Sequence, residues 1–218
     1  MDEEKYRMII LDCEQGGEEW FKARSGIPTS SCFDKVITPK TMKPSAQAQN
    51  YLYTLAGERI AGIKAETYQN EWMKRGSDME GEARDLFQLV KDVDVKQVGL
   101  VYPDEKKRYA CSPDGLLENA GLELKCPAMH THISYLLGQC LPGDYIPQVQ
   151  GSLLITGFQS WWFMSYYPGL PPFILKTTRN NSFISRLKAL LDDFCDELDM
   201  VERRLRALLC SDYYIYMQ

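Results

Sequence analysis

The stretch from Arg108 to Pro127 most constrains the fold, because two short β-rich runs are separated there by turn-forming residues. The runs are RYACSPDGLL and GLELKCP, and the turn lies around residues 118–121. This pattern predicts an antiparallel hairpin. Side chains two residues apart in a strand share a face, so Glu123 and Lys125 point one way while Leu122 points toward a core.

Two registers of this hairpin bring Asp114 to the face that carries Glu123 and Lys125. A turn centred between Asn119 and Ala120 sets Asp114 opposite Lys125, with the Cβ atom of Glu123 roughly 7–8 Å away on the diagonal. A turn centred one residue earlier sets Asp114 opposite Glu123, and a half-step between the two sends Asp114 to the other face. Two such carboxylates suit a bridging divalent cation such as Mg²⁺, which prefers oxygen ligands. A solvated, charged hairpin face is the alternative.

The other patterns along the chain read as helices, then strands, then a helix between strands. Helices are expected at residues 16–26, 27–37, 45–62, 72–90 and 145–157. Strands are expected at residues 94–103, 108–117, 121–127, 159–168 and 172–179. This order predicts an α/β domain with a mixed central sheet flanked by helices. The length suits one domain, so residues 1–218 are expected to form a single unit.

Two of the predicted helices carry an apolar stripe. In the helix at 72–90 the stripe consists of Met79, Ala83, Leu86, Phe87 and Val90. In a long C-terminal helix, spacings of three and four residues define a seam of Ile184, Leu187, Leu191, Phe194, Leu198, Val201 and Leu205. That seam packs along its own domain or forms a subunit contact, and we favour the first.

The net charge of −5 does not indicate a protein that coats nucleic acid, although an enzyme can hold DNA in a local basic channel and keep an acidic exterior. One Pro-flanked loop is mildly basic, with Lys40 and Lys43. No apolar run approaches the length of a membrane span, and the acidic N-terminus is not a secretory signal. We therefore expect a cytoplasmic protein.

The seven cysteines include no C-x-x-C pair, which argues against a disulfide framework or a four-cysteine metal site. Cys126, His130 and His132 lie close in sequence, but zinc would need a fourth ligand. We expect buried thiols and loop histidines instead.

Several motifs together carry a resemblance to a known family. Pro113-Asp114, eight residues and then Glu123-Leu124-Lys125 resembles the PD-(D/E)xK nuclease signature. With the flanking ACSPDG, GLELKCP, QVQ, RGSDMEGEARDLF and WFKARSGIPTSS, the chain resembles the bacteriophage lambda exonuclease family, among the YqaJ-like viral recombinases. The resemblance runs in order from about Trp20 to about Tyr167.

The resemblance implies a restriction-endonuclease-like fold and Mg²⁺-dependent, processive digestion of one strand of linear double-stranded DNA from its 5′-phosphorylated end. The product would carry a 3′ single-stranded overhang for recombination. The resemblance also implies a homotrimer ring around the DNA, a single-strand annealing protein as partner, and a phage or prophage origin in a bacterial host.

The resemblance assigns roles to the hairpin residues. Asp114 and Glu123 match the family's metal-binding carboxylates, with the backbone carbonyl of Leu124 as a further ligand. Lys125 matches the catalytic lysine. In the resulting mechanism the metal-bound carboxylates polarise the scissile phosphate and lower the pKa of a bound water, which Lys125 orients. A second Mg²⁺ would stabilise the leaving 3′ oxygen, and Mn²⁺ is a possible substitute.

Two helices are expected to contribute to the same site. Glu80 matches an upstream acid that serves the metal, although it could instead pair with Arg84 four residues later. Gln150, and less surely Gln148, match glutamines of the following helix. Residues two apart in a helix face different ways, so only one of the two is expected to reach the site.

Arg24, Ser31 and Ser112 match positions that bind the 5′-terminal phosphate in the family. Their chemistry suits the role, since arginine offers a bidentate fork and hydroxyls donate at short range. Trp20 is either a core residue or a side chain that stacks near the duplex end.

Other classes of function stay open at this point. One is a site-specific endonuclease on the same fold. A second is a DNA-end-binding module without activity, and a third is an interaction protein that uses the C-terminal seam.

Overall fold

The structure is a computed structural model that describes residues 8–62 and 71–210, with side chains described outside residues 71–78. The helices are α1 (Glu18–Arg24), α2 (Ala48–Ala61), α3 (Glu71–Lys91), α4 (Met129–Gly138), α5 (Ile146–Thr156) and α6 (Asn181–Cys210), with short 3₁₀ helices η1 (Ser30–Lys35) and η2 (Gly143–Tyr145). The strands are β1 (Ile9–Leu11), β2 (Leu100–Tyr102), β3 (Gly115–Leu116), β4 (Ala120–Lys125), β5 (Ser160–Ser165) and β6 (Phe173–Thr178).

The central sheet has the strand order β3-β4-β5-β6 and is mixed, as predicted. β4 and β5 run parallel, while the β3–β4 and β5–β6 pairs are antiparallel. A parallel pair needs a long crossover, and here it carries α4, η2 and α5. β1 and β2 form a separate antiparallel pair beside this sheet.

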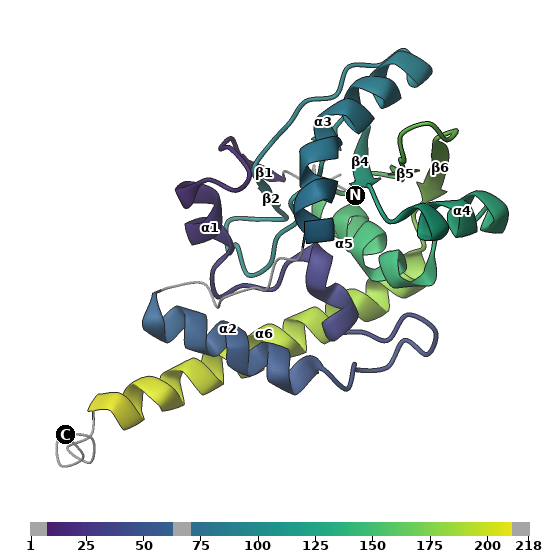
Figure 1. Cartoon of the computed structure of the whole chain (residues 1–218). Coiled ribbons are helices and arrows are strands. Elements are labelled where there is room, and N and C mark those ends of the chain that lie inside the picture. Colours follow the sequence, from purple (N-terminus) through teal and green to yellow (C-terminus); the bar gives the residue numbers. More distant parts are fainter. Residues whose placement is uncertain (1–7, 63–70, 211–218) are drawn as a thin grey trace, which may run out of the picture.

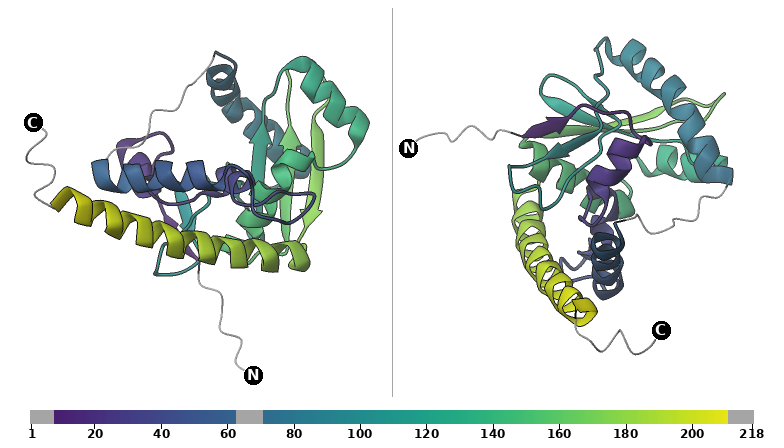
Figure 2. Two further views of the ribbon diagram at one scale, coloured as in Figure 1. Left: turned by 90° about the horizontal axis from the view of Figure 1, so that it is seen from below. Right: turned by 90° about the vertical axis from the view of Figure 1, so that its left-hand side faces the viewer.

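Helices cover both faces of the central sheet (Figure 1). On one face, Ala83 and Phe87 of α3 pack against Leu122 and Leu124 of β4. On the other face, α5 lies between the sheet and the pair formed by α2 and α6, and Figure 2 shows α6 running the length of that side. The larger core cluster joins η1, α2, α5 and α6.

The two apolar stripes pack largely as predicted. In α3 the stripe enters the core except at Val90, which is 50% exposed. In α6 every seam residue from Ile184 to Leu205 packs within the chain, against α2 and α5. The seam is thus used inside the molecule.

Some elements differ from the prediction. Residues 129–138 form helix α4, where loop histidines were expected, and His132 is fully buried in it. Its Nδ1 lies 2.8 Å from Ser165 Oγ and its Nε2 lies 3.0 Å from the Pro171 carbonyl. Helix α2 begins at Ala48, later than Ser45, and only two residues of the 108–117 run pair as a strand. The thiols are not uniformly buried, since Cys140 and Cys210 are exposed.

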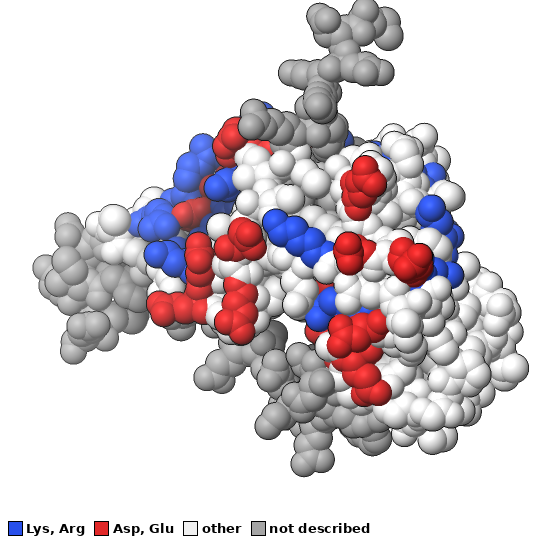
Figure 3. Space-filling model, turned by 90° about the horizontal axis from the view of Figure 1, so that it is seen from above, with Lys and Arg blue, Asp and Glu red and all other residues white. Residues whose placement is uncertain are grey.

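Acidic and basic side chains are interspersed on the face drawn in Figure 3. Both signs of charge are therefore present on this face, in a chain whose net charge is −5. In the described part of the chain, every helix is too short or too polar to cross a bilayer.

Candidate active site

The hairpin adopts one of the two predicted registers. Gly115 pairs with Leu122 and Leu116 with Gly121, so continuing the pairing by one residue sets Asp114 opposite Glu123. The backbone N–H of Asp114 donates to the Leu122 carbonyl at 3.1 Å. The Oδ2 atom of Asp114 accepts the N–H of Leu124 at 2.6 Å. Asp114 is therefore fixed to the edge of β4, just where the two-residue strand β3 ends.

Glu123 and Lys125 share a face of β4 and contact one another. Glu123 is only 2% exposed, and its Oε1 accepts hydrogen bonds from Lys125 Nζ and, at 2.5 Å, from Gln148 Nε2. The ammonium of Lys125 also lies 5.3 Å from the ring centre of Tyr145. Each side chain in this cluster is held from at least two sides.

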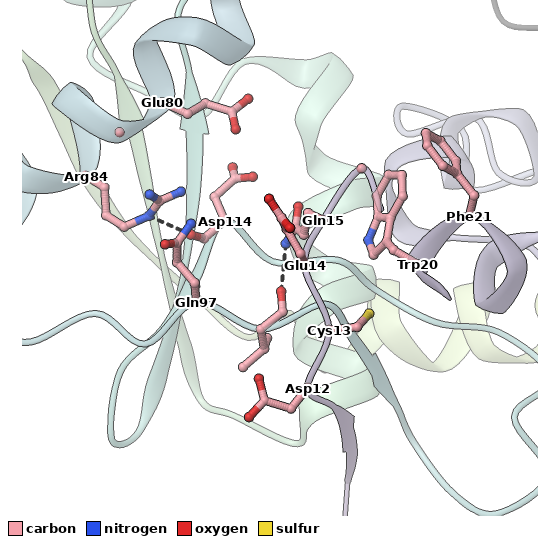
Figure 4. Close-up of a pocket in the computed structure, with 13 residues that line it drawn as sticks. Asp12, Cys13, Glu14, Gln15, Trp20, Phe21, Glu80, Arg84, Gln97 and Asp114 are labelled. Carbon is pink, nitrogen blue, oxygen red and sulfur yellow. Dashed lines mark hydrogen bonds between the residues drawn. The ribbon is translucent and has the colours of Figure 1, made fainter. Parts of the chain in front are cut away.

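Glu80 and Arg84 of α3 both turn toward the hairpin. Figure 4 shows the Glu80 carboxylate facing that of Asp114 across a cavity. Arg84 Nε donates to the backbone carbonyl of Asp114 at 3.1 Å. The side-chain oxygen of Gln97, oriented toward Arg84, accepts from its guanidinium at 3.0 and 3.1 Å. Arg84 thus braces the backbone of Asp114, and Glu80 adds a third carboxylate.

Burial and like charge shift the pKa values of this cluster. Burial raises the pKa of Glu80 to about 7, and the charge of Asp114 adds to the increase. Burial also raises the pKa of Glu123 to about 7 against the attraction of Lys125. The pKa of Asp114 is raised by burial as well. The two neighbouring carboxylates raise the pKa of Lys125 above its ordinary value, although burial opposes them. The lysine stays charged, and one ammonium faces three carboxylates.

The chemistry of this donor set fits a hard divalent cation. Among the side chains of residues 8–62 and 79–210, no three of His, Cys, Asp or Glu already stand in a coordination arrangement. However, Glu80, Asp114 and Glu123 offer only oxygen donors, and a cation would offset the burial that raises their pKa values and the like charge that adds to it at Glu80 and Glu123. The Leu124 carbonyl faces the same edge as the Leu124 N–H, which bonds Asp114, so it adds an oxygen there.

The two glutamines of α5 make different contacts, and the favoured candidate, Gln150, is not the one that contacts Glu123. Gln150 is 4% exposed and turned away from Glu123, because its amide donates to the Thr178 carbonyl at 3.0 Å and accepts from the Asn180 N–H at 2.8 Å. Gln148, the less favoured candidate, is the one that contacts Glu123. Only one of the pair reaches the carboxylates, as the helix geometry requires.

The candidates for binding a phosphate lie together. Arg24 Nη2 lies 3.3 Å from both Thr29 Oγ1 and Ser31 Oγ, and these two hydroxyls are 3.3 Å apart. The Arg24 guanidinium stacks over the Trp20 ring at 4.2 Å. Trp20 Nε1 in turn donates to Ser112 Oγ at 2.9 Å. Trp20 therefore links Arg24 to Ser112.

A cavity extends from Trp20, the ring on which Arg24 stacks, to the carboxylates of Glu80 and Asp114. It has a volume of about 870 Å³, and its wall includes Trp20, Glu80, Arg84 and Asp114 (Figure 4). Ser112 lies two residues before Asp114, so the segment from Ser112 to Asp114 joins the arginine pocket to the carboxylates.

Several supporting residues were not predicted from the sequence. The side-chain amide of Gln15 donates to the carbonyls of Val98 and Pro113, each at 2.8 Å, and so holds the residue before Asp114. Arg84, predicted only as a partner of Glu80, holds Asp114 itself. These contacts join parts of the chain that are far apart in sequence, and no local pattern signals them.

Comparisons with known proteins agree on one family. The family model of the YqaJ-like viral recombinase domain matches residues 19–159. The crystal structure of an alkaline exonuclease (LHK-Exo) from Laribacter hongkongensis is 30% identical, with a TM-score of 0.80, and covers 88% of this chain and 98% of that one. A structure of the same enzyme in complex with dAMP matches equally well.

A phage-related exonuclease from Haemophilus somnus 129PT shares the fold at 14% identity, with a TM-score of 0.64 and coverage of 82% of this chain and 96% of that one. A comparison with curated proteins finds no match. The predicted fold class is confirmed by these structures. The chain belongs to the YqaJ-like viral recombinase family, whose members are nucleases like the bacteriophage lambda exonuclease.

Proposed function

We propose that this chain is a Mg²⁺-dependent 5′–3′ exonuclease. It digests one strand of linear double-stranded DNA processively from a 5′-phosphorylated end and leaves a 3′ single-stranded overhang for strand annealing. The observation that carries the proposal is the cavity whose wall includes Trp20, Glu80 and Asp114, because Trp20 stacks on Arg24 and Asp114 lies opposite Glu123 in the hairpin.

The cation would be held by Glu80, Asp114, Glu123 and the Leu124 carbonyl, which supply the oxygen ligands that Mg²⁺ prefers. A two-metal arrangement fits the number of carboxylates, and the same oxygen donors would also bind Mn²⁺. When bound, the metal would stabilise charge on the scissile phosphate and lower the pKa of a water molecule.

Lys125 has the role of positioning the nucleophile. Its ammonium, held between Glu123 and the Tyr145 ring, would donate a hydrogen bond to a water or a phosphate oxygen. Gln148 fixes the Glu123 carboxylate from the other side. The two contacts leave Glu123 little freedom to rotate.

Arg24 binds the 5′-phosphate in this proposal, with Ser31 beside it. The guanidinium already faces two hydroxyls at 3.3 Å, and all of these groups are donors to an anion. The Ser112 hydroxyl donates to the Gly99 carbonyl at 2.7 Å, so it would donate to a phosphate only after giving up that bond.

The family membership supports an assembly and a partner. The active form is proposed to be a homotrimer ring that encloses the duplex and works with a single-strand annealing protein in the cytoplasm of a bacterial host. The ring explains processivity, because DNA cannot leave between cuts. Light scattering at working concentration tests it, and a monomer contradicts it.

Digestion of linear duplex with 5′-phosphate ends, with and without Mg²⁺, tests the activity directly. Closed circular duplex in a parallel reaction separates this proposal from its rivals. An exonuclease degrades the linear substrate and spares the circle, while an endonuclease of the same fold cuts the circle. An end-binding module without activity leaves both intact with Mg²⁺ present.

A further inference from the structure

We propose that Glu58 and Arg59, in the last turn of α2, are positioning residues that hold the Arg24 pocket in shape and set its preference for phosphorylated 5′ ends. The inference rests on the proposed function, because it assigns the pocket a terminal phosphate. It adds two residues of α2 that act on the pocket through the backbone of Gly26.

The side chains of Glu58 and Arg59 both form hydrogen bonds with the backbone of Gly26. The Gly26 N–H donates to Glu58 Oε2 at 2.8 Å, and Arg59 Nε donates to the Gly26 carbonyl at 2.6 Å. Gly26 has a φ of +72°, and a Cβ atom there would lie 2.3 Å from Arg59 Cγ. The left-handed conformation and this close approach both require glycine, so α2 fixes the turn that follows α1.

That turn connects the two halves of the pocket. Arg24 lies two residues before Gly26, and Thr29 and Ser31 follow it. The far side of the turn is also attached to α2, since the Thr29 N–H donates to the Tyr51 hydroxyl at 3.3 Å. The distances from the guanidinium to the two hydroxyls therefore depend on how α2 holds this segment.

Glu58 also balances charge around the pocket. It is a buried acid, 8% exposed. Burial lowers the pKa of Arg24, and the negative charge of Glu58 opposes that decrease. The same carboxylate thus orients the turn and stabilises the cation that the turn positions.

Arg59 extends the support to α6. Its Nη1 lies 2.7 Å from Asp199 Oδ1 and 3.0 Å from Glu202 Oε2. Figure 2 shows α2 lying alongside α6 over this stretch. The Arg59 guanidinium thus joins the Gly26 turn to α6. Its bond to Gly26 and its ion pairs with α6 can be removed by separate substitutions.

The test measures KM and kcat on duplexes with 5′-phosphate and 5′-hydroxyl ends. Arg59→Lys keeps a positive charge for α6 but lacks an Nε–H at the position that bonds Gly26. We expect KM on phosphorylated ends to rise roughly tenfold, the size of losing a hydrogen bond that supports a charged group. The KM on hydroxyl ends should stay near the wild-type value, and so should kcat on both substrates. The preference for phosphorylated ends therefore falls by the same factor.

Glu202→Gln is the matched control, because it weakens the ion pair with α6 and leaves the Gly26 bonds in place. It should retain the wild-type preference. Glu58→Leu removes the other bond to Gly26 and is an independent second variant, with the same expected loss. Thermal melting by circular dichroism confirms that each variant is folded.

The outcomes separate this inference from the function on which it rests. Suppose that the wild type prefers phosphorylated ends. If Arg59→Lys and Glu58→Leu keep that preference, or lose activity equally on phosphorylated and hydroxyl ends, the positioning role is wrong and the phosphate pocket stands. If the wild type shows no preference for phosphate, the pocket itself is wrong.

Discussion

The two halves of the site are built with opposite electrostatics. The hairpin half places three carboxylates, Glu80, Asp114 and Glu123, around one ammonium, and burial raises all three pKa values. The α1 half places one half-buried guanidinium among hydroxyls, and burial lowers its pKa. The first half attracts a cation and the second attracts an anion.

This difference explains how one substrate can engage both halves. Under the proposed function, a terminal phosphate would bind Arg24, and a phosphodiester with its metal ion would bind the carboxylates. The two halves are joined by the Trp20–Ser112 hydrogen bond and by the short segment to Asp114. Positioning an end at one half therefore sets which bond lies at the other.

The largest effect is expected at the hairpin half. Lys125→Ala removes the group that orients the nucleophile, so cleavage should fall by roughly 10²–10⁴-fold while end binding changes little. Initial rates and a gel-shift assay measure the two. Lys188→Ala is the control, since Lys188 is an exposed residue of α6 that forms an ion pair with Asp192. Wild-type cleavage by the Lys125 variant ends the assignment.

A smaller effect is expected at the α1 half. Arg24→Gln removes a charged donor to the phosphate, so the preference for phosphorylated ends should fall by roughly 10–100-fold. Competition between phosphorylated and unphosphorylated duplexes measures it. Lys22→Gln, an exposed change on the same helix, should leave the preference intact. An unchanged preference in the Arg24 variant contradicts the anion-binding half of the comparison.

The pH dependence of metal binding sharpens the charge argument. Glu80 and Glu123 have pKa values of about 7, above the ordinary value of 4.5, so lowering the pH through 7 protonates them. Mg²⁺ binds the deprotonated form, so its affinity should fall by about tenfold per pH unit for each proton displaced. Calorimetry at pH 8 and pH 6 measures this. Equal affinity at both values contradicts it.

The smallest effects separate the two glutamines. Gln148→Ala frees one side of Glu123 and should slow cleavage by about tenfold with little loss of stability. Gln150→Ala leaves the Thr178 carbonyl and the Asn180 N–H without their partner, so it should cost about 1–3 kcal/mol of unfolding free energy. Steady-state rates and thermal melts distinguish them. The reverse pattern would restore Gln150 to the active site.

The hairpin was predictable because its signal is local. Alternation along GLELKCP fixes which side chains share a face, and the turn residues limit the registers to two. Selecting the register that pairs Gly115 with Leu122 needed the structure, since the sequence allows the turn to shift by one residue.

The supporting contacts were not predictable, since they depend on tertiary packing. Whether Gln148 or Gln150 faces the carboxylates depends on which side of α5 packs on the sheet. The bonds from Gln15 to Pro113 and from Trp20 to Ser112 join segments more than 90 residues apart in the chain.

Helix α4 did leave a signal, because Met129, Ile133 and Leu137 recur at helical spacing. All three are exposed, so the stripe does not mark a core face. The close Cys126, His130 and His132 suggested a loop instead.

The most direct test uses a linear duplex with a 5′-phosphate on one strand only and a separate label at each end of both strands. With Mg²⁺, the account predicts loss of the phosphorylated strand from its 5′ end, an intact complementary strand, and the same loss slowed by roughly 10²–10⁴-fold for Lys125→Ala. Shortening from a 3′ end, or equal loss of both strands, would contradict the account.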